Sequence, residues 1–338
     1  MTSLTIRPAV LPDELDDFNS YPYVLNQEIA GDLAAGRRRP EWLWLALRGG
    51  RVTARAGWWS RPGGEHPLVM DIFDVADGYL DDGLRLLEAA LPTPAPEFTR
   101  FVAPDWRRSA ADTWMDVLEQ AGAKLFVERL RLQWHPGTPI PAPAGRLSFR
   151  APREAGELID LMTLVLDGSL DAHSRDELTR MTPRECAEEQ YRTELEMYPS
   201  PRDWWRIATL PDGDPVGFVI PAHNGYNPII AYIGVAPAHR GHGYIDDLLA
   251  EGTRLLADQG VPRIRAATDV GNRPMAAAFA RAGYDTFQRL TDRAGHDSPA
   301  RRRRAPPAPG RVSRVWECAR HRRSRSPRPR AGPVDMTE

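Results

Sequence analysis

A short run from Arg240 to Tyr244 has the residue types and spacing of an anion-binding loop. It follows an apolar, β-branched stretch at 229–235 that predicts a buried strand, and it precedes a helical pattern starting at Tyr244. The first backbone N–H groups of a helix have no internal partner and lie at its positive end. Gly241 and Gly243 allow a close approach of the backbone to phosphate, and Arg240 adds a charged fork. The sequence therefore predicts a phosphate site at a strand-to-helix junction.

Two other phosphate-binding motifs do not fit this run. A dinucleotide fingerprint needs a third glycine where Asp246 stands, and the sequence contains no G-K-[ST] of a P-loop. For residues 240–243 alone, an ordinary turn with a solvated arginine remains an alternative. The residues downstream favour the phosphate site.

A second motif covers residues 272–284 and predicts a capped helix. Asn272 is a candidate N-cap, Pro274 lies in the first turn and Gly283 fits the C-terminal end. Together the two stretches resemble the signatures of the GNAT superfamily of N-acetyltransferases, [QR]-x-x-G-x-[GA] and N-x-x-[AM]-x-x-x-[YF]-x-x-x-G-[FY], over about 60 residues. The first signature departs at its last position, where Ile245 replaces glycine or alanine.

The resemblance implies transfer of an acetyl group from acetyl-CoA to a primary amine by direct attack in a ternary complex. It also implies a parallel strand pair that splays apart after a bulged fourth strand, leaving a slot for pantetheine between 229–235 and 263–268. Backbone amides on the fourth strand would orient the thioester and stabilise the charge that develops on its oxygen. The residues implied in cofactor binding are Ile233, Val235, Arg240, Gly241, His242, Gly243, Tyr244, Ile245, Asn272 and Phe279.

The catalytic acid and base are less defined. Phe279 stands where many relatives carry a tyrosine, and a phenyl ring has no proton to give, so we expect it to pack. Tyr232 is the candidate acid, Tyr284 is an alternative better suited to a core, and a thiolate can also leave unassisted. Asp269 is the candidate base, and a turn-forming role is its alternative. Glu194, Glu196 and Asp203 either attract a cationic amine or form a solvated face. No metal site is expected.

The order of elements predicted for residues 1–135 recurs after residue 145. Tyr79-Leu80-Asp81-Asp82 echoes Tyr244-Ile245-Asp246-Asp247. We therefore expect an α/β fold of two tandem GNAT-like domains, each a mixed, mostly antiparallel twisted sheet flanked by helices. The domains are 1–135 and 146–292, joined by a Pro-rich linker at 136–145. The first copy has only Ala76-Asp77-Gly78 before its helix, and an acid there repels phosphate, so we expect it to be catalytically silent. An unrelated α/β domain is the alternative.

Residues 293–338 hold 13 arginines and four acids, whereas the rest of the chain is acidic. We expect a disordered Arg/Pro-rich tail or an artefact of a shifted reading frame, and we do not expect nucleic-acid binding. Two cysteines, no 18-residue apolar run and no leader favour a cytoplasmic protein without membrane contact. The expected partner is a small-molecule or peptide amine. A non-catalytic acyl-CoA-binding or regulatory protein is the alternative function.

Overall fold

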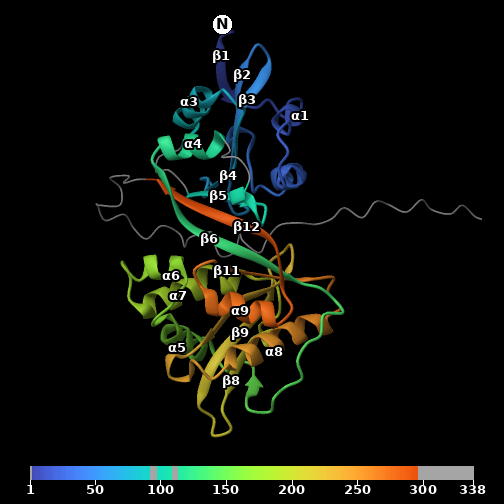
Figure 1. Cartoon of the computed structure of the whole chain (residues 1–338), viewed down its shortest axis with the longest axis vertical. Helices are drawn as coiled ribbons and strands as arrows, with labels where there is room; N and C mark the ends of the chain where they lie inside the picture. The colour runs from blue at the N-terminus through green and yellow to red at the C-terminus, as the bar shows by residue number, and fades with distance from the viewer. Residues whose placement is uncertain (1, 92–96, 109–112, 296–338) are drawn as a thin grey trace, which may run out of the picture.

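The computed structural model describes residues 2–91, 97–108 and 113–295, with the side chains of 108, 294 and 295 excepted. Its strands form one twelve-stranded sheet in the order β1-β2-β3-β4-β5-β12-β6-β11-β10-β9-β8-β7 (Figure 1). The strand pairs are antiparallel except for β4 with β5 and β10 with β11, which are parallel. Helices flank the sheet in both halves. The predicted fold class, two successive GNAT-like units with mixed and mostly antiparallel sheets, is confirmed.

The N-terminal half of the molecule runs from residue 4 to residue 134. Its strands and helices are β1 (Leu4–Pro8), α1 (Leu15–Phe18), α2 (Ile29–Ala34), β2 (Leu43–Arg48), β3 (Arg51–Trp59), β4 (Val69–Val75), α3 (Leu80–Ala90), β5 (Glu97–Val102), α4 (Thr113–Gln120) and β6 (Ala123–Trp134). Short 3-10 turns lie between several of them, at Asn26–Glu28, Pro40–Trp42 and Trp106–Arg108.

The C-terminal half repeats the order with one extra helix. Its elements are β7 (Ser148–Arg150), α5 (Ala155–Leu166), α6 (Ala172–Glu177), α7 (Pro183–Thr193), β8 (Arg206–Thr209), β9 (Pro215–His223), β10 (Pro228–Val235), α8 (Tyr244–Asp258), β11 (Ile264–Asp269), α9 (Arg273–Arg281) and β12 (Asp285–Gly295). The extra helix is α6, which lies between α5 and α7. The tail lies outside the described residues from position 296, and β12 continues three residues beyond the predicted domain end.

The parallel pairs separate almost at once. β10 is registered with β11 at Ile229 and Arg265, near the start of both strands, and no further pair is found along their described lengths. A register shift between Ile230 and Tyr232 marks a bulge in β10. The bulged and splayed fourth strand expected from the resemblance is therefore present. β4 and β5 behave alike, since two residue pairs join them within the part of the chain that the structure describes.

The two halves exchange their last strands. β6, which ends the N-terminal half, pairs with β11 of the C-terminal half along six residues. β12, which ends the chain's described part, lies between β5 and β6 and pairs with both (Figure 1). Each half has its own core beneath its helices. α3 and α4 cover one face of the sheet in the N-terminal half, and α8 and α9 cover one face in the C-terminal half. The exchange makes the sheet continuous through the middle of the molecule.

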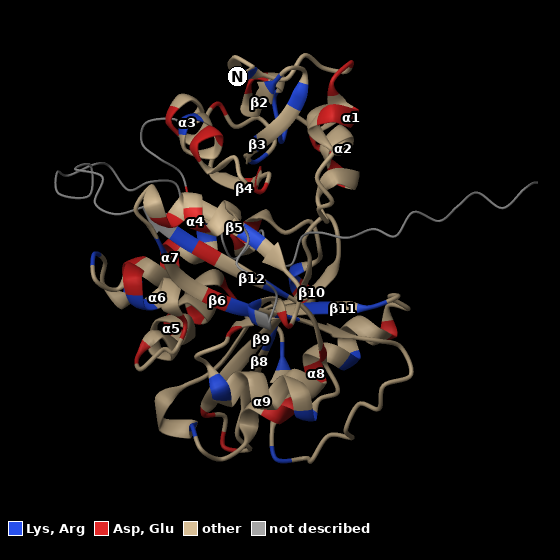
Figure 2. Cartoon of the chain, turned by 45° about the horizontal axis from the view of Figure 1, so that its top comes forward, with Lys and Arg blue, Asp and Glu red and all other residues tan. Residues whose placement is uncertain are grey.

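The exchanged strands carry many charges. Lys, Arg, Asp and Glu gather along β12, β6 and β11 (Figure 2). Arg131 on β6 is 1% exposed, and its guanidinium lies over the rings of Phe101 on β5 and Phe287 on β12, at 4.4 and 5.0 Å. Arg129 pairs with Asp269 across β6 and β11 at 3.1 Å. These contacts join residues of both halves in the interior.

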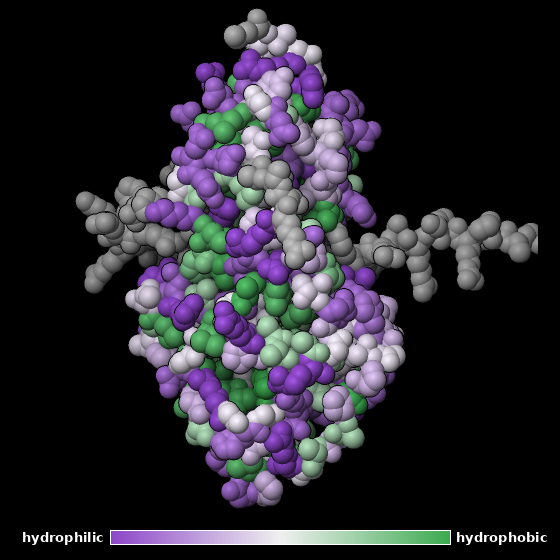
Figure 3. All heavy atoms as spheres, viewed as in Figure 1, coloured by the Kyte–Doolittle hydropathy of each residue, from purple (hydrophilic) through white to green (hydrophobic). Residues whose placement is uncertain are grey.

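The outer surface mixes polar and apolar side chains (Figure 3). Within the described residues, the exposed large apolar side chains are Val10, Leu125, Leu164, Leu170, Met197 and Val270. None of the helices described is both long and apolar enough to cross a membrane.

An ion pair between β7 and α5 gives the fold a pH dependence. Arg150 donates two hydrogen bonds to the carboxylate of Glu157, one of them 3.0 Å long, and the Arg153 amide donates a third of 2.8 Å. The hydrogen bonds from Arg150 are the main reason that the pKa of Glu157 falls from 4.5 to about 2. A lowered carboxyl pKa stabilises the fold above the ordinary value, and that stabilisation is lost as pH falls through the folded-state value.

We therefore expect Glu157→Gln to lower the urea midpoint at about pH 6 and to make its further decline toward about pH 3 shallower than in the wild type. Urea unfolding at both pH values measures this. Glu154→Gln is the control, because Glu154 forms no ion pair within the described part of the chain. Equal slopes for the wild type and Glu157→Gln would show that this carboxylate does not contribute.

Candidate functional site

The loop between β10 and α8 presents unpaired backbone amides. Gly241 and Gly243 have φ angles of +83° and +73°, in the left-handed region that glycine adopts without strain. Gly243 is the N-cap of α8, a helix of 15 residues. Among the residues described, no backbone acceptor is found for the amides of 242–245. The positive end of a long helix is therefore open to an anion, as the sequence predicts.

Two acids in the first turn of α8 are neutralised by arginines. Asp246 pairs with Arg281 of α9 at 2.7 Å, and Asp247 pairs with Arg146, which precedes β7, at 2.5 Å. Unpaired carboxylates at this point would repel a phosphate group. Their pairing leaves the field of the helix end favourable to an anion.

Arg240 has a different role from the one expected. Its guanidinium donates to three carbonyl oxygens, those of Val235 at 3.1 Å, Asp167 at 2.7 Å and Val165 at 2.9 Å. Two of these carbonyls lie at the C-terminal end of α5, which is the negative end of that helix. The side chain thus fastens the loop to α5 and does not point as a free fork toward the loop amides.

The edge of β10 that faces β11 is open at Ile233 and Val235. The Ala236 amide donates to the Val216 carbonyl on β9 at 2.8 Å. Because the amides of successive strand residues point to opposite edges, those of Val235 and Ile233 point away from β9 and toward β11. Both residues are partly buried. This edge offers backbone hydrogen bonds to an extended ligand.

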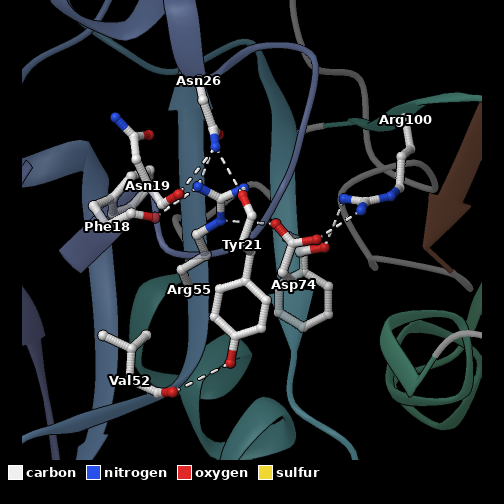
Figure 4. A network of polar contacts seen from close by, with 9 residues as sticks. Phe18, Asn19, Tyr21, Asn26, Val52, Arg55, Asp74 and Arg100 are labelled. Atoms are coloured by element: carbon white, nitrogen blue, oxygen red, sulfur yellow. Dashed lines mark hydrogen bonds and ion pairs between the residues drawn. The ribbon is translucent and has the colours of Figure 1, made fainter. Parts of the chain in front are cut away.

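In the N-terminal half, side chains close the equivalent edge, between β4 and β5 (Figure 4). Arg100 on β5 donates to the Phe73 carbonyl on β4 at 2.9 Å and to the Asp74 carboxylate at 2.6 Å. Arg55 on β3 completes the network with a 2.7 Å bond to Asp74, and with bonds to the carbonyls of Phe18 and Tyr21. The two arginines hold the pKa of Asp74 below its usual value against the effect of burial. The Arg100 side chain bridges the two strands where they diverge.

The C-terminal half has a shorter, uncharged residue at the equivalent place. The bulges of β4 and β10 align Val69 with Ile229, and these two residues pair with Glu97 and Arg265. Arg100, three positions after Glu97, therefore corresponds to Thr268, which is buried. The two halves therefore differ in the slot as well as in the loop, and both differences favour the C-terminal half as the binding half.

The two candidate catalytic residues lie near this edge in different surroundings. Tyr232 is partly buried just after the bulge of β10, and its ring meets Phe218 edge-on at 4.9 Å. Asp269 ends β11 and is 3% exposed. One of its oxygens accepts from the Ala172 amide of α6 at 2.6 Å, and the other lies 3.1 Å from Arg129. Burial raises the pKa of Asp269, although Arg129 opposes the effect. Through these contacts Asp269 holds the start of α6 against the end of β11. They argue against a role for Asp269 as the general base.

The residues of the second motif serve mainly to build α9. The Asn272 side chain accepts from the Met275 amide at 3.3 Å and caps the helix. Phe279 is 1% exposed and packs against Tyr284 at 5.1 Å between ring centres, so it is a core residue. Tyr284 is buried and bonded to the Thr253 hydroxyl, which fits the core alternative. Burial raises the pKa of Tyr284.

The remaining candidates are held by neighbours. His239 lies 3.0 Å from Asp214, and His242 stacks on the Tyr244 ring at 5.6 Å. Glu194 is buried and accepts a 2.9 Å bond from the Tyr198 hydroxyl, and Glu196 pairs with Arg202 at 3.2 Å. Ile245 lies in the first turn of α8 and is partly buried. Sequence reasoning missed Arg146 and Thr268. The internal repeat contained the signal for Thr268, whereas Arg146 carried no signal.

The sequence comparison identifies this region. Residues 172–284 match the Acetyltransferase (GNAT) family, and the match contains the loop, the splayed strands and α9. These residues form a GNAT-family acetyltransferase domain. The chain therefore contains an acetyltransferase domain, and the match does not extend to its N-terminal half. A search of curated proteins by sequence found no match.

Solved GNAT structures share the fold over most of the chain. A GCN5-related N-acetyltransferase from Sphaerobacter thermophilus has 15% identity and a TM-score of 0.54, and the alignment covers 87% of this chain and 97% of that one. A fungal GCN5-related glucosamine N-acetyltransferase region, within a multi-domain GH3 β-N-acetylglucosaminidase, has the same identity and TM-score and covers 87% of this chain and 38% of that one. At these identities the likeness establishes the fold of this chain and not the acceptor of its reaction.

Proposed function

We propose that the GNAT domain transfers an acetyl group from acetyl-CoA to a primary amine, and that only the C-terminal half does so. The observation that carries the proposal is the open loop and strand edge of this half beside the closed edge of the other. The amides of residues 242–245 would hold the diphosphate of the cofactor. The amides of Ile233 and Val235 would pair with pantetheine and orient the thioester.

The reaction needs little from the side chains beyond orientation. The amine nitrogen attacks the thioester carbonyl carbon, the carbon–sulfur bond breaks, and the thiolate leaves with the electron pair. A thiol has a pKa of about 8.5, so its thiolate leaves without a strong acid near neutral pH. Tyr232 is the residue beside the strand edge that can donate a proton to the sulfur. The proton lost by the amine passes to water, because Asp269 is engaged with α6 and Arg129.

The acceptor is an amine on a small molecule or a peptide, and the cytoplasm is the proposed compartment. A non-catalytic acyl-CoA-binding protein is the second candidate. It is favoured by one observation: Phe279 occupies the position that often carries the acidic tyrosine, and its ring is buried. The two functions share the cofactor and differ in turnover.

Two measurements on the wild type test the proposal. Calorimetry with acetyl-CoA measures binding, and thiol release in the presence of a panel of primary amines measures transfer. We expect saturable binding and amine-dependent release. Binding without release on any amine would favour the second candidate, and absence of binding would contradict both.

A single substitution tests which half binds. Thr268→Arg places in the C-terminal half the side chain that closes the N-terminal one, and we expect it to weaken acetyl-CoA binding at least about tenfold through bulk in the slot. Thr268→Ser removes one methyl group and is the matched control, with affinity near that of the wild type. Equal affinity of the wild type and Thr268→Arg would place the cofactor elsewhere.

A further inference from the structure

The segment that joins the two halves lies along α8. We call residues 136–146 the strap. Ile140 packs against the core beneath α8, and Arg254 near the end of that helix donates to the Pro141 carbonyl at 2.7 Å. Arg146, at the other end of the strap, reaches the loop that opens α8. The strap thus follows the helix from its last turns to its first and is not a free linker.

Arg146 holds the loop by its backbone. Its Nη1 donates to the His242 carbonyl at 2.8 Å and its Nη2 to the Gly243 carbonyl at 3.0 Å. Its Nε donates to the Asp247 carboxylate at 2.8 Å, and its guanidinium lies 4.9 Å from the centre of the Tyr244 ring. One planar guanidinium therefore fixes two consecutive carbonyls and the first turn of the helix.

Fixing a carbonyl also fixes the amide that shares its peptide plane. The C=O of one residue and the N–H of the next point in opposite directions within a planar unit. The bonds to the carbonyls of His242 and Gly243 therefore aim the amides of Gly243 and Tyr244 away from Arg146. A loop with two glycines has many backbone conformations of similar energy, so these amides need such a restraint to stay aligned.

We propose that Arg146 is a positioning residue of the acetyl-CoA site, which it serves by aiming the diphosphate-binding amides and not by touching the cofactor. This inference rests on the proposed function. It makes the strap part of the binding site, so the N-terminal half is tied to the site through the strap that follows it.

The experiment compares Arg146→Ala with Arg281→Ala. Both variants remove an arginine paired with an acid in the first turn of α8, but only Arg146 bonds to the loop carbonyls. We expect Arg146→Ala to raise the dissociation constant of acetyl-CoA about tenfold or more, and Arg281→Ala to change it less than about threefold. With S-acetylpantetheine, which has the thioester and no diphosphate, neither variant should alter binding or turnover. Arg146→Lys keeps the charge without the fork and should recover little.

Equal losses in Arg146→Ala and Arg281→Ala would show that charge, and not position, is responsible, and would overturn the inference. An equal loss with S-acetylpantetheine would also overturn it, because a general distortion would then be the cause. Backbone NMR order parameters of Gly243 and Tyr244 without cofactor give a separate readout, and we expect lower values in Arg146→Ala only. If the wild type does not bind acetyl-CoA, the proposed function fails, while the order parameters still decide whether Arg146 orders the loop.

Discussion

Replacing Gly243 by aspartate is expected to weaken acetyl-CoA binding by at least about 100-fold. Gly243 has a φ of +73° and caps α8, so a side chain there is strained and a carboxylate would lie among the amides that receive the diphosphate. Repulsion between the carboxylate and the diphosphate supplies most of the expected loss. Calorimetry with acetyl-CoA is the measurement.

Gly260 provides a matched control at the other end of the same helix. Its φ is +67° and nothing lies within 4 Å of a β-carbon placed there, so Gly260→Asp carries a similar backbone strain without approaching the loop. We expect both variants to lose similar thermal stability and only Gly243→Asp to lose affinity. Wild-type affinity in Gly243→Asp would remove the diphosphate from this loop.

The second large effect concerns the exchanged strands. We expect residues 136–295, produced alone, to lack a cooperative unfolding transition. In that fragment β12 loses both of its neighbours, β5 and β6, and β11 loses the six residue pairs that it forms with β6. The fragment would have an unpaired strand edge, and Gln288 would lose its hydrogen bond from Arg131. We therefore expect a partly formed sheet. Urea unfolding followed by circular dichroism measures the transition.

A nicked chain is the control for this experiment. A protease site inserted between Pro143 and Ala144, both exposed, allows the folded protein to be cut without removing any strand. β6 and β12 pair along ten residues, so we expect the two pieces to stay together through size-exclusion chromatography and to unfold together. A fragment 136–295 that unfolds cooperatively, or pieces that separate, would show that the halves are independent.

Local patterns were enough to predict the strand, the loop and the helix that follows it, whereas the splayed strand pair was expected from the resemblance to the GNAT superfamily. Gly241 and Gly243 precede a helical pattern and follow the apolar run at 229–235, so the predicted position of the anion site depends on neighbours in sequence. The closed edge of the N-terminal half depends on Arg100, which the strand registers align with Thr268. That difference was within reach of a strand-by-strand comparison of the two copies.

The exchange of strands was not predictable in the same way. β6 and β12 each have the pattern of the last strand of a half. The alternation of side chains does not determine whether such a strand joins β5 or β11. The partners of Arg240 and Asp269 were missed for a related reason, since the carbonyls of α5 and the amide of α6 lie far away in sequence. Spacing located these side chains but not their contacts.

The strand exchange has a consequence for how this chain can change over generations. The N-terminal copy can change its loop and fill its slot with Arg100 while β6 still pairs with β11. It cannot be deleted, since the C-terminal copy borrows a strand from it. A gene duplication of this kind, once its products have traded strands, retains each copy for as long as the other is under selection.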